Sequence, residues 1–305
     1  MREFAISLAQ NNNGNANSFV IELNQQIKTE GTFMNFKLAA FADEADGRIS
    51  EQIKAMTENG IDYLEIRGVD GQNISEITKE KAKEVRKQLD DAGLAVWSLG
   101  SPYGKFGMGD GFDEHLESFK RGLETADILG AKHVRMFSFY VPSGEEEKYR
   151  QEVFRRLECF IEAAKNSDVI LCHENEKGIY GDMAVRCEEI HRTFPQLKAV
   201  FDPANFIQCG QDTVEAWKLL SPYVEYMHIK DAMADGSVVP AGKGIGNLPY
   251  LLENYKGTVL TLEPHLSVFD GFDKLEGEEK TKMGYCYPTS RAAFDAAVNA
   301  LKDLI

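Results

Sequence analysis

The sequence is poor in positive charge and contains no long apolar run. Its 34 Lys and Arg residues stand against 49 Asp and Glu residues, so the formal net charge at pH 7 is −15. Nucleic acid is held mainly through Lys and Arg contacts to phosphates, and this balance therefore argues against a nucleic-acid partner. No stretch approaches the roughly 18 apolar residues of a membrane span, so we expect no membrane partner either.

Paired cysteines and a secretion signal are also missing. The cysteines are an odd number without short paired spacings, which suggests reduced thiols rather than a disulfide framework. Residues 1–17 do not combine a basic region with an apolar stretch, as a signal peptide would. Together these features predict a cytoplasmic protein. The five cysteines are Cys159, Cys172, Cys187, Cys209 and Cys286.

The chain has the length of one large domain preceded by an extension. Its 305 residues match a one-domain (β/α)8 barrel, which takes roughly 250 residues plus insertions. Residues 1–33 differ from the rest, because Gln10–Asn17 is polar and of low complexity. This extension is either translated upstream sequence, with Met34 as the native start, or a genuine flexible arm. We expect the folded domain to be residues 34–305.

After the extension, short apolar runs alternate with amphipathic stretches of helical length. The stretches carry apolar residues at helical spacing, such as Leu116 and Phe119. Three of them end at Gly60, Gly93 and Gly130, and glycine suits the left-handed position after a helix. The apolar runs predict eight strands, at Lys37–Phe41, Tyr63–Arg67, Ala95–Leu99, His133–Phe137, Val169–His173, Ala199–Asp202, Tyr226–Ile229 and Val259–Glu263.

Strands that are separated by helices run parallel, because each crossover helix returns the chain to the same edge of the sheet. Eight such units either close into a barrel or form an open doubly wound sheet. Ionisable residues follow nearly every predicted strand, and this is where barrel active sites are built. An open sheet would concentrate its site at one switch point instead. We therefore predict an α/β fold, a single-domain (β/α)8 TIM barrel.

Four of the strand-end residues are of types that bind metal ions: Glu174, Asp202, His228 and Glu263. In a barrel their side chains converge on one face. Three carboxylates and one imidazole form an oxygen-rich set that suits a hard divalent ion. Without a cation, the carboxylates would raise one another's pKa values. Each residue alone has a simpler explanation, such as a helix cap. Four at corresponding positions predict a site for one divalent ion, with Mn²⁺ favoured and Mg²⁺, Co²⁺ or Zn²⁺ as alternatives.

The segments around these residues carry recognisable motifs. They are His-Glu-Asn at 173–175, Phe-Asp-Pro-Ala-Asn-Phe at 201–206, His-Ile-Lys-Asp at 228–231 and Leu-Glu-Pro-His-Leu at 262–266. They resemble the signatures of the xylose isomerase-like TIM barrel superfamily, and more narrowly of its branch of sugar phosphate isomerases and epimerases. The resemblance covers about residues 35–305. It implies that Glu174, Asp202, His228 and Glu263 hold the ion.

The resemblance also implies roles in proton transfer. In the ketose epimerases of this family, the two residues that match Glu174 and Glu263 face each other across the substrate as acid and base. Those epimerases carry a second histidine three residues after the metal-binding aspartate, where this chain has Asn205. Substrate contacts at this position therefore differ, which puts a ketose 3-epimerase assignment in question.

Enolising chemistry suits these residue types. A metal ion on a substrate carbonyl and the neighbouring hydroxyl polarises both. One carboxylate can then remove the α-proton and another can return it elsewhere. We predict Glu174 and Glu263 as the catalytic residues. In the alternative, both are only ligands, and Glu176 or His265 moves the proton.

Further polar residues near the strand ends are predicted to bind the substrate. For two of them, Arg67 and Arg135, a structural ion pair is an equal alternative, and Lys230 alternatively pairs with Asp231. Gly242–Gly246 does not have the spacing of a dinucleotide fingerprint and is expected to form a turn. The predicted substrate-binding residues are Glu65, Arg67, Arg135, Glu176, Asn205, Lys230 and His265.

The leading functional prediction is a divalent-metal-dependent isomerase or epimerase of a sugar or sugar phosphate, acting through an enediolate. A dehydratase of a keto-inositol or keto-sugar uses the same parts, because loss of a β-hydroxyl can follow removal of the α-proton. An endonuclease IV-like repair enzyme would need several metal ions, a basic groove and more than six histidines. The expected partner is a small-molecule sugar or sugar phosphate. A homo-oligomer is expected by fold analogy only.

Overall fold

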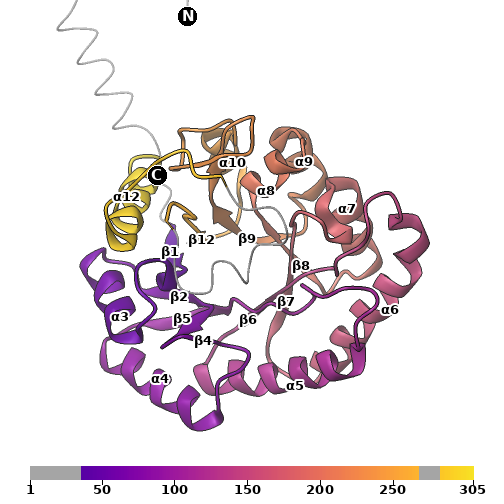
Figure 1. The fold of residues 1–305 in the computed structure, drawn as a ribbon, viewed down its shortest axis with the longest axis horizontal. Helices are drawn as coiled ribbons and strands as arrows, with labels where there is room; N and C mark the ends of the chain where they lie inside the picture. Colours follow the sequence, from indigo (N-terminus) through magenta and orange to yellow (C-terminus); the bar gives the residue numbers. More distant parts are fainter. Residues whose placement is uncertain (1–35, 268–281) are drawn as a thin grey trace, which may run out of the picture. The chain divides into compact units, whose positions relative to one another are not determined.

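Eight parallel strands close into a barrel in the order β1-β12-β9-β8-β7-β6-β5-β2 (Figure 1). The computed structural model describes residues 36–267 and 282–305, and the predicted extension at 1–33 lies outside this part of the chain. The first strand pairs with the last, Lys37 opposite Val259. The predicted TIM barrel is confirmed. Its strands are β1 (Lys37–Ala40), β2 (Tyr63–Ile66), β5 (Ala95–Leu99), β6 (His133–Met136), β7 (Ile170–Glu174), β8 (Lys198–Phe201), β9 (Val224–Ile229) and β12 (Val259–Leu262).

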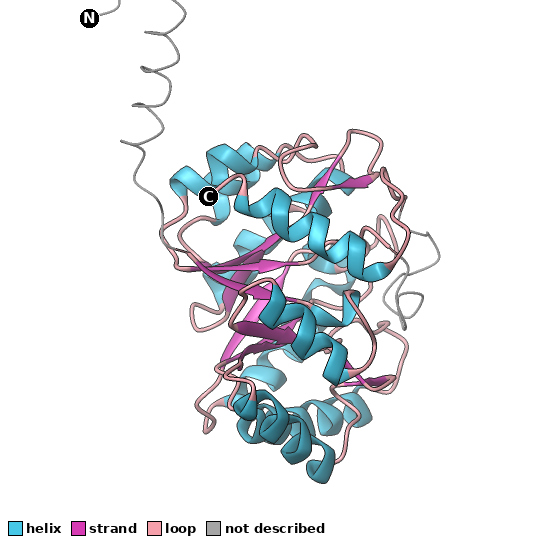
Figure 2. Cartoon of the chain, turned by 90° about the vertical axis from the view of Figure 1, so that its left-hand side faces the viewer, coloured by secondary structure: helices cyan, strands magenta, loops and turns pink. Residues whose placement is uncertain are grey.

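Helices lie outside the strands, as the cyan and magenta elements of Figure 2 show. Among the described residues, no helix combines the length and the hydrophobicity that a membrane span requires. Two short antiparallel pairs, β3 (Gly68–Val69) with β4 (Gln72–Asn73) and β10 (Asp231–Ala232) with β11 (Val238–Val239), sit in the loops. The helices are η1 (Ala42–Glu44), α3 (Ile49–Glu58), α4 (Lys79–Asp91), α5 (Phe112–Leu129), α6 (Glu146–Ala164), η2 (Tyr180–Asp182), α7 (Ala184–Thr193), α8 (Pro203–Gln208), α9 (Thr213–Leu220), α10 (Leu248–Asn254) and α12 (Ser290–Lys302).

The local signals in the sequence correspond to these elements. Gly60, Gly93 and Gly130 follow α3, α4 and α5 with φ values of 62°, 73° and 72°, the left-handed conformation that glycine adopts without steric cost. All five cysteines are free, as their odd number and spacing predicted. The predicted strand positions match the barrel strands, and their ends differ by one or two residues. Such shifts are usual at element boundaries, because the terminal hydrogen bonds of an element are its weakest.

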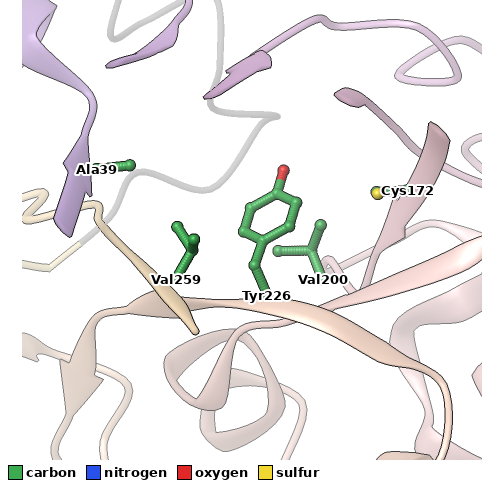
Figure 3. Close-up of a cluster of buried hydrophobic side chains, with 5 residues drawn as sticks. All are labelled: Ala39, Cys172, Val200, Tyr226 and Val259. Carbon is green, nitrogen blue, oxygen red and sulfur yellow. The ribbon is translucent and has the colours of Figure 1, made fainter. Parts of the chain in front are cut away.

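The lower half of the barrel interior is a mostly apolar layer. Alternate residues of each strand point inward. Figure 3 shows the Tyr226 ring standing among apolar side chains, with its hydroxyl directed away from its own strand. That hydroxyl donates a hydrogen bond to Glu65 Oε1 at 2.9 Å. Polar contacts therefore begin directly above this layer, which consists of Ala39, Cys172, Val200, Tyr226 and Val259.

The glycine-rich loop after β9 is folded around one carboxylate. The predicted turn at Gly242–Gly246 wraps around Asp231, whose oxygens accept four backbone N–H bonds at 2.8–3.0 Å. A Cβ atom at Gly244 would lie 2.3 Å from Asp231 Oδ1. The close approach therefore requires glycine at this position. Asp231 faces this loop, so it organises the barrel mouth without taking part in the cluster described below.

Replacing Asp231 by asparagine should lower the free energy of unfolding by about 3 kcal/mol. Each oxygen of Asp231 accepts two of the four N–H bonds, so an amide nitrogen at either position leaves two N–H donors without an acceptor. Urea unfolding followed by circular dichroism measures the change. Asp235→Asn is the matched control, because Asp235 is exposed and its oxygen accepts hydrogen bonds from the neighbouring Ser237. Equal losses in both variants would contradict this role of Asp231.

Candidate metal centre and active site

Four neighbouring barrel strands bring the predicted ligand residues together. Glu174 ends β7, Asp202 follows β8, His228 lies on β9 and Glu263 follows β12. These strands are adjacent and parallel, so their carboxyl ends meet on one face. Each side chain offers one ligand atom, and the four atoms all lie within 4.8 Å of one another. All four residues are buried.

His228 Nδ1 lies at the centre of this cluster. It is 3.0 Å from Glu174 Oε1, 3.3 Å from Glu263 Oε2 and 3.9 Å from Asp202 Oδ2. Burial by itself lowers the pKa of His228, but the carboxylates of Glu174, Glu65 and Glu263 more than offset this and raise it well above its usual value. The cluster therefore attracts positive charge at the point where the four ligand atoms meet.

The other ring nitrogen of His228 is held by Glu65. Nε2 lies 3.1 Å from Glu65 Oε2, while Glu65 Oε1 accepts the hydrogen bond from Tyr226. Metal-binding histidines commonly give their second N–H to a carboxylate, which fixes the tautomer and the ring orientation. We predicted Glu65 as a substrate-binding residue. Both of its oxygens are engaged within the barrel, Oε2 with His228 and Oε1 with Tyr226.

The chemistry of the four residues fits a hard divalent ion. Glu174 Oε2 and Asp202 Oδ2 are buried and accept no hydrogen bond from the described residues. Each lies near a cation instead, Glu174 Oε2 3.1 Å from Arg135 Nη1 and Asp202 Oδ2 2.9 Å from Lys230 Nζ. Burial raises the pKa of Asp202 to about 7, and the nearby Glu263 and Glu174 carboxylates add to the effect. A bound cation would offset the mutual repulsion of these carboxylates.

Lys230 places a positive charge against two of the ligands. Its Nζ lies 2.9 Å from Asp202 Oδ2 and 2.9 Å from Glu263 Oε2. Burial by itself lowers the pKa of this ammonium group, but Asp202 and Glu263 raise it well above its usual value. Lys230 therefore pairs with ligand carboxylates and not with its neighbour Asp231. It faces the same side as His228 because the two are separated by two residues along an extended strand.

Arg135 contacts the glutamate oxygens that His228 does not. Its Nη1 lies 3.1 Å from Glu174 Oε2, outside hydrogen-bond geometry, and 3.6 Å from Glu263 Oε1. The guanidinium also lies over the rings of Phe41 and Phe137, 5.0 Å from each centroid. Each glutamate therefore has one oxygen directed at the ligand cluster and the other directed at Arg135.

Arg67 connects the cluster to acids that follow the first strand. Its Nε and Nη2 donate to the two oxygens of Asp43 at 2.8 and 3.0 Å. Its Nη2 also donates to Glu44 at 3.2 Å, and its Nη1 lies 3.4 Å from Glu263 Oε1. Burial raises the pKa of Glu44 to about 8. Both arginines therefore form the ion pairs that were the alternative to direct substrate binding.

His265 is held in a left-handed backbone conformation with φ of 46°. Such a conformation costs a non-glycine residue about 1–3 kcal/mol. Its N–H donates to Glu44 Oε2 at 2.7 Å, and its Nε2 lies 3.6 Å from Glu263 Oε1. Glu44, Glu263 and His265 form a second group of ligand-type atoms within 4.8 Å. The first group offers four ligand-type atoms and this one three, so the first is the stronger candidate for an ion.

Two asparagines fix the positions of the ligands on β7 and β8. Asn205 Nδ2 donates to Glu174 Oε1 at 3.3 Å and to the Asn175 carbonyl at 2.9 Å. The Asn205 N–H donates to Asp202 Oδ1 at 3.0 Å. Asn175 in turn bonds both the N–H and the carbonyl of Asp202 at 2.9 Å. The position that departs from the family motif is thus occupied by a side-chain amide that contacts Glu174, while its backbone N–H contacts Asp202.

Glu176 lies farther out, paired with a lysine from another loop. Lys105 Nζ is 2.7 Å from Glu176 Oε2 and 4.7 Å from the centroid of the Phe137 ring. Burial by itself raises the pKa of Glu176, but Lys105 and Lys230 offset this and lower it. The negative charge of Glu176, at the edge of the site, is therefore balanced by the Lys105 ammonium group.

Several residues of this network did not stand out in the sequence. Phe41, Asp43 and Glu44 follow the first strand, and that position at a strand end was the signal that could have identified them. Lys105 lies in the loop between β5 and α5, and nothing in the neighbouring sequence distinguishes it from a surface lysine.

One curated relative is a 3-dehydroshikimate dehydratase from Bacillus anthracis. It is 22% identical over 177 residues, which cover 57% of this chain. The match spans 63% of the relative's own length, less than two thirds of it.

Solved structures share the fold. The IOLI protein with a bound zinc atom matches with a TM-score of 0.70 at 18% identity, over 88% of this chain and 97% of that one. The 3-keto-D-glucoside 4-epimerase from E. coli matches with a TM-score of 0.62 at 17% identity, over 88% of this chain and 98% of that one. At these identities the likeness concerns the fold alone.

A family model describes the chain more directly. The model of the xylose isomerase-like TIM barrel matches residues 53–275, which is more than half of the sequence. The chain therefore belongs to the xylose isomerase-like TIM barrel family.

Proposed function

We propose that the protein is a divalent-metal-dependent isomerase or epimerase of a sugar or sugar phosphate. The observation that carries the proposal is the arrangement of Glu174 and Glu263. They come from strands β7 and β12, and each directs one oxygen at the ligand cluster and the other at Arg135. A carboxylate of this kind can hold a metal ion with one oxygen and exchange a proton with the other.

The proposed chemistry follows from these two groups. A bound divalent ion would polarise a substrate carbonyl and its neighbouring hydroxyl and stabilise the enediolate. One glutamate removes the proton from the α-carbon, and the other returns a proton at another carbon or on the other face. Because the two glutamates come from different strands, they can approach the substrate from different directions. This allows proton return at another carbon, which is isomerisation, or on the other face of the same carbon, which is epimerisation. We propose Mn²⁺ as the ion, with Mg²⁺, Co²⁺ or Zn²⁺ as alternatives.

The other residues of the site position these groups. Glu65 orients His228, and Asn205 holds Glu174. Burial by itself raises the pKa of Glu263, but Lys230, His265 and His228 hold it well below its usual value. Glu263 is therefore ionised at neutral pH, as a metal ligand must be. Hydroxyl groups of the substrate find donors and acceptors in the side chains around this pair.

A dehydratase is the second candidate, and the curated relative favours it, because that protein is named as a 3-dehydroshikimate dehydratase. The same removal of an α-proton begins both reactions. In a dehydratase, the loss of a β-hydroxyl as water follows. The mass of the product separates the two candidates, because isomerisation conserves mass and dehydration removes water.

The proposed setting is a reducing cytoplasm, in keeping with five free cysteines. The proposed partner is a small molecule. A homo-oligomer is proposed on fold analogy only.

Metal binding tests the ligand assignment without any substrate. After dialysis against Mn²⁺, Mg²⁺, Co²⁺ or Zn²⁺, elemental mass spectrometry should find close to one ion per chain. Asp202→Asn should weaken binding by at least about 100-fold, because it removes one charged ligand from the set. Asp235→Asn makes the same chemical change on the surface and should bind normally. Unchanged binding in Asp202→Asn would contradict the ligand set.

Deuterium exchange tests the catalytic assignment. The metal-loaded protein in heavy water should label the α-carbon of its substrate within a panel of ketoses, keto-inositols and their phosphates. Glu174→Gln or Glu263→Gln should slow this exchange by about 10³-fold, because the amide cannot take the proton. Metal content is measured on the same samples to separate lost chemistry from lost binding.

The same assay separates the two interpretations of proton transfer. His265→Gln and Glu176→Gln should keep exchange within about tenfold of the unmodified protein if Glu174 and Glu263 move the proton. Exchange that is abolished by either of these changes, and retained in the two glutamate variants of the cluster, would reduce Glu174 and Glu263 to ligands.

A further inference from the structure

The basic side chains at the active face are already matched by carboxylates. Arg67, Arg135 and Lys230 each lie within 3.6 Å of oxygens from at least two carboxylates. All three are nearly inaccessible to solvent. They therefore stabilise the buried acids of the site. Because these acids already balance their positive charge, they are poorly suited to bind an anionic group of a substrate.

Lys105 is the outermost of these cations. Its side chain is 12% exposed, and its ammonium lies 2.7 Å from Glu176 Oε2. The Phe137 ring lies next to both Lys105 and Arg135. Its centroid is 4.7 Å from Lys105 Nζ and 5.0 Å from Arg135 Cζ. Lys105 is thus the group best placed to meet an anion entering the mouth, and Glu176 neutralises it.

The charge of the whole network is negative. The three ligand carboxylates, Glu65, Glu176, Asp43 and Glu44 make seven acids against four basic side chains, an excess of three negative charges. A divalent ion offsets two of them, with His228 as a neutral ligand. The loaded site therefore has no excess of positive charge.

A second cavity on the same face is no better suited to an anion. It has a volume of about 810 Å³ and lies between the loops after β1 and β2 and the start of α12. Its charged lining residues are Asp43, Asp46, Asp70, Arg48 and Arg291. Both arginines are paired with carboxylates at 2.6–2.8 Å. The aspartates outnumber them, so this cavity also lacks an unmatched cation.

We propose that the substrate is an uncharged polyhydroxylated ketone, either a free keto-sugar or a keto-polyol, and that Glu176 excludes phosphorylated and carboxylated analogues by neutralising Lys105. The proposal rests on the proposed function and narrows its substrate class. Moving a phosphate or carboxylate from water into this site would cost free energy. Arg67, Arg135, Lys230 and Lys105, the basic side chains of the site within the described residues, already pair with carboxylates. Hydroxyl groups require only hydrogen bonds, which the paired side chains can still supply.

Matched substrate pairs test the proposal on the full metal-loaded chain. Each pair is a ketose and its own phosphate ester, such as xylulose with xylulose 5-phosphate, and fructose with fructose 6-phosphate. Keto-inositols and 3-dehydroshikimate complete the panel as further neutral and carboxylated compounds. We expect kcat/KM for deuterium exchange to be at least about 100-fold higher for the neutral member of the reactive pair, because like charges disfavour the ester.

The Glu176→Gln variant tests the role of this residue. It removes the carboxylate 2.7 Å from Lys105 Nζ, so the preference for the neutral member should narrow by about tenfold, mainly through a lower KM for the ester. The readout is the ratio of kcat/KM for the two members of a pair, which cancels any effect of the variant common to both. Glu253→Gln is the matched control, because it alters the net charge equally at an exposed position near the end of α10. This control should leave the preference unchanged.

The possible results are distinguishable. A preference of the unmodified protein for phosphorylated or carboxylated compounds would overturn the proposal and leave metal-dependent proton transfer intact. An unchanged preference in Glu176→Gln would overturn the role of Glu176. Absence of exchange with every compound, despite bound metal, would overturn the proposed function and this substrate class together.

Discussion

The structure depends on burying three carboxylates side by side at the mouth of a barrel. Like charges in a poorly solvated place raise one another's pKa values, and each buried charge must be paired to be tolerated. The surrounding residues meet this requirement. Lys230 pairs with Asp202 and Glu263, and Arg135 spans the two glutamates. A divalent ion held by these carboxylates would offset more of the repulsion among them.

The same constraint explains why the site is a network and not an isolated set of ligands. Arg67 balances part of the charge of Glu263, but it brings Asp43 and Glu44 with it. Glu44 then receives the N–H of His265, whose strained backbone needs such a contact. Each added cation requires a further acid. The acidic and basic side chains at the barrel mouth therefore balance one another closely. Binding a hydroxyl group there costs less free energy than binding a charged group.

The barrel supplies this arrangement through two regular features. Parallel strands bring their carboxyl ends to one face, and alternation along each strand sorts side chains into inward and outward sets. On β9, Tyr226 closes the apolar layer, His228 enters the ligand cluster two residues later, and Lys230 follows after two more. A one-residue shift in any of these strands would turn its predicted ligand toward the helices. The candidate metal site therefore depends on the register of the barrel strands.

The fold and the ligand residues could be predicted because both are encoded locally. Glu174 and Glu263 stand directly after apolar runs, and a polar residue there points to the barrel mouth whatever its partners are. Contacts between distant segments left no such signal. Glu44 and His265 are 221 residues apart, and Lys105 and Glu176 are 71 apart. Glu65 shows a subtler limit, because its place at a strand end did not reveal whether it faces substrate or supports His228 from below.

Anomalous diffraction from crystals grown with Mn²⁺ and a bound sugar tests the central claim most directly. The account predicts one manganese peak about 2.0–2.3 Å from atoms of Glu174, Asp202, His228 and Glu263. It also predicts that the two glutamates lie on either side of the sugar's α-carbon. A peak bound instead by Glu44 and His265, or no peak at the four residues in metal-saturated crystals, would contradict it.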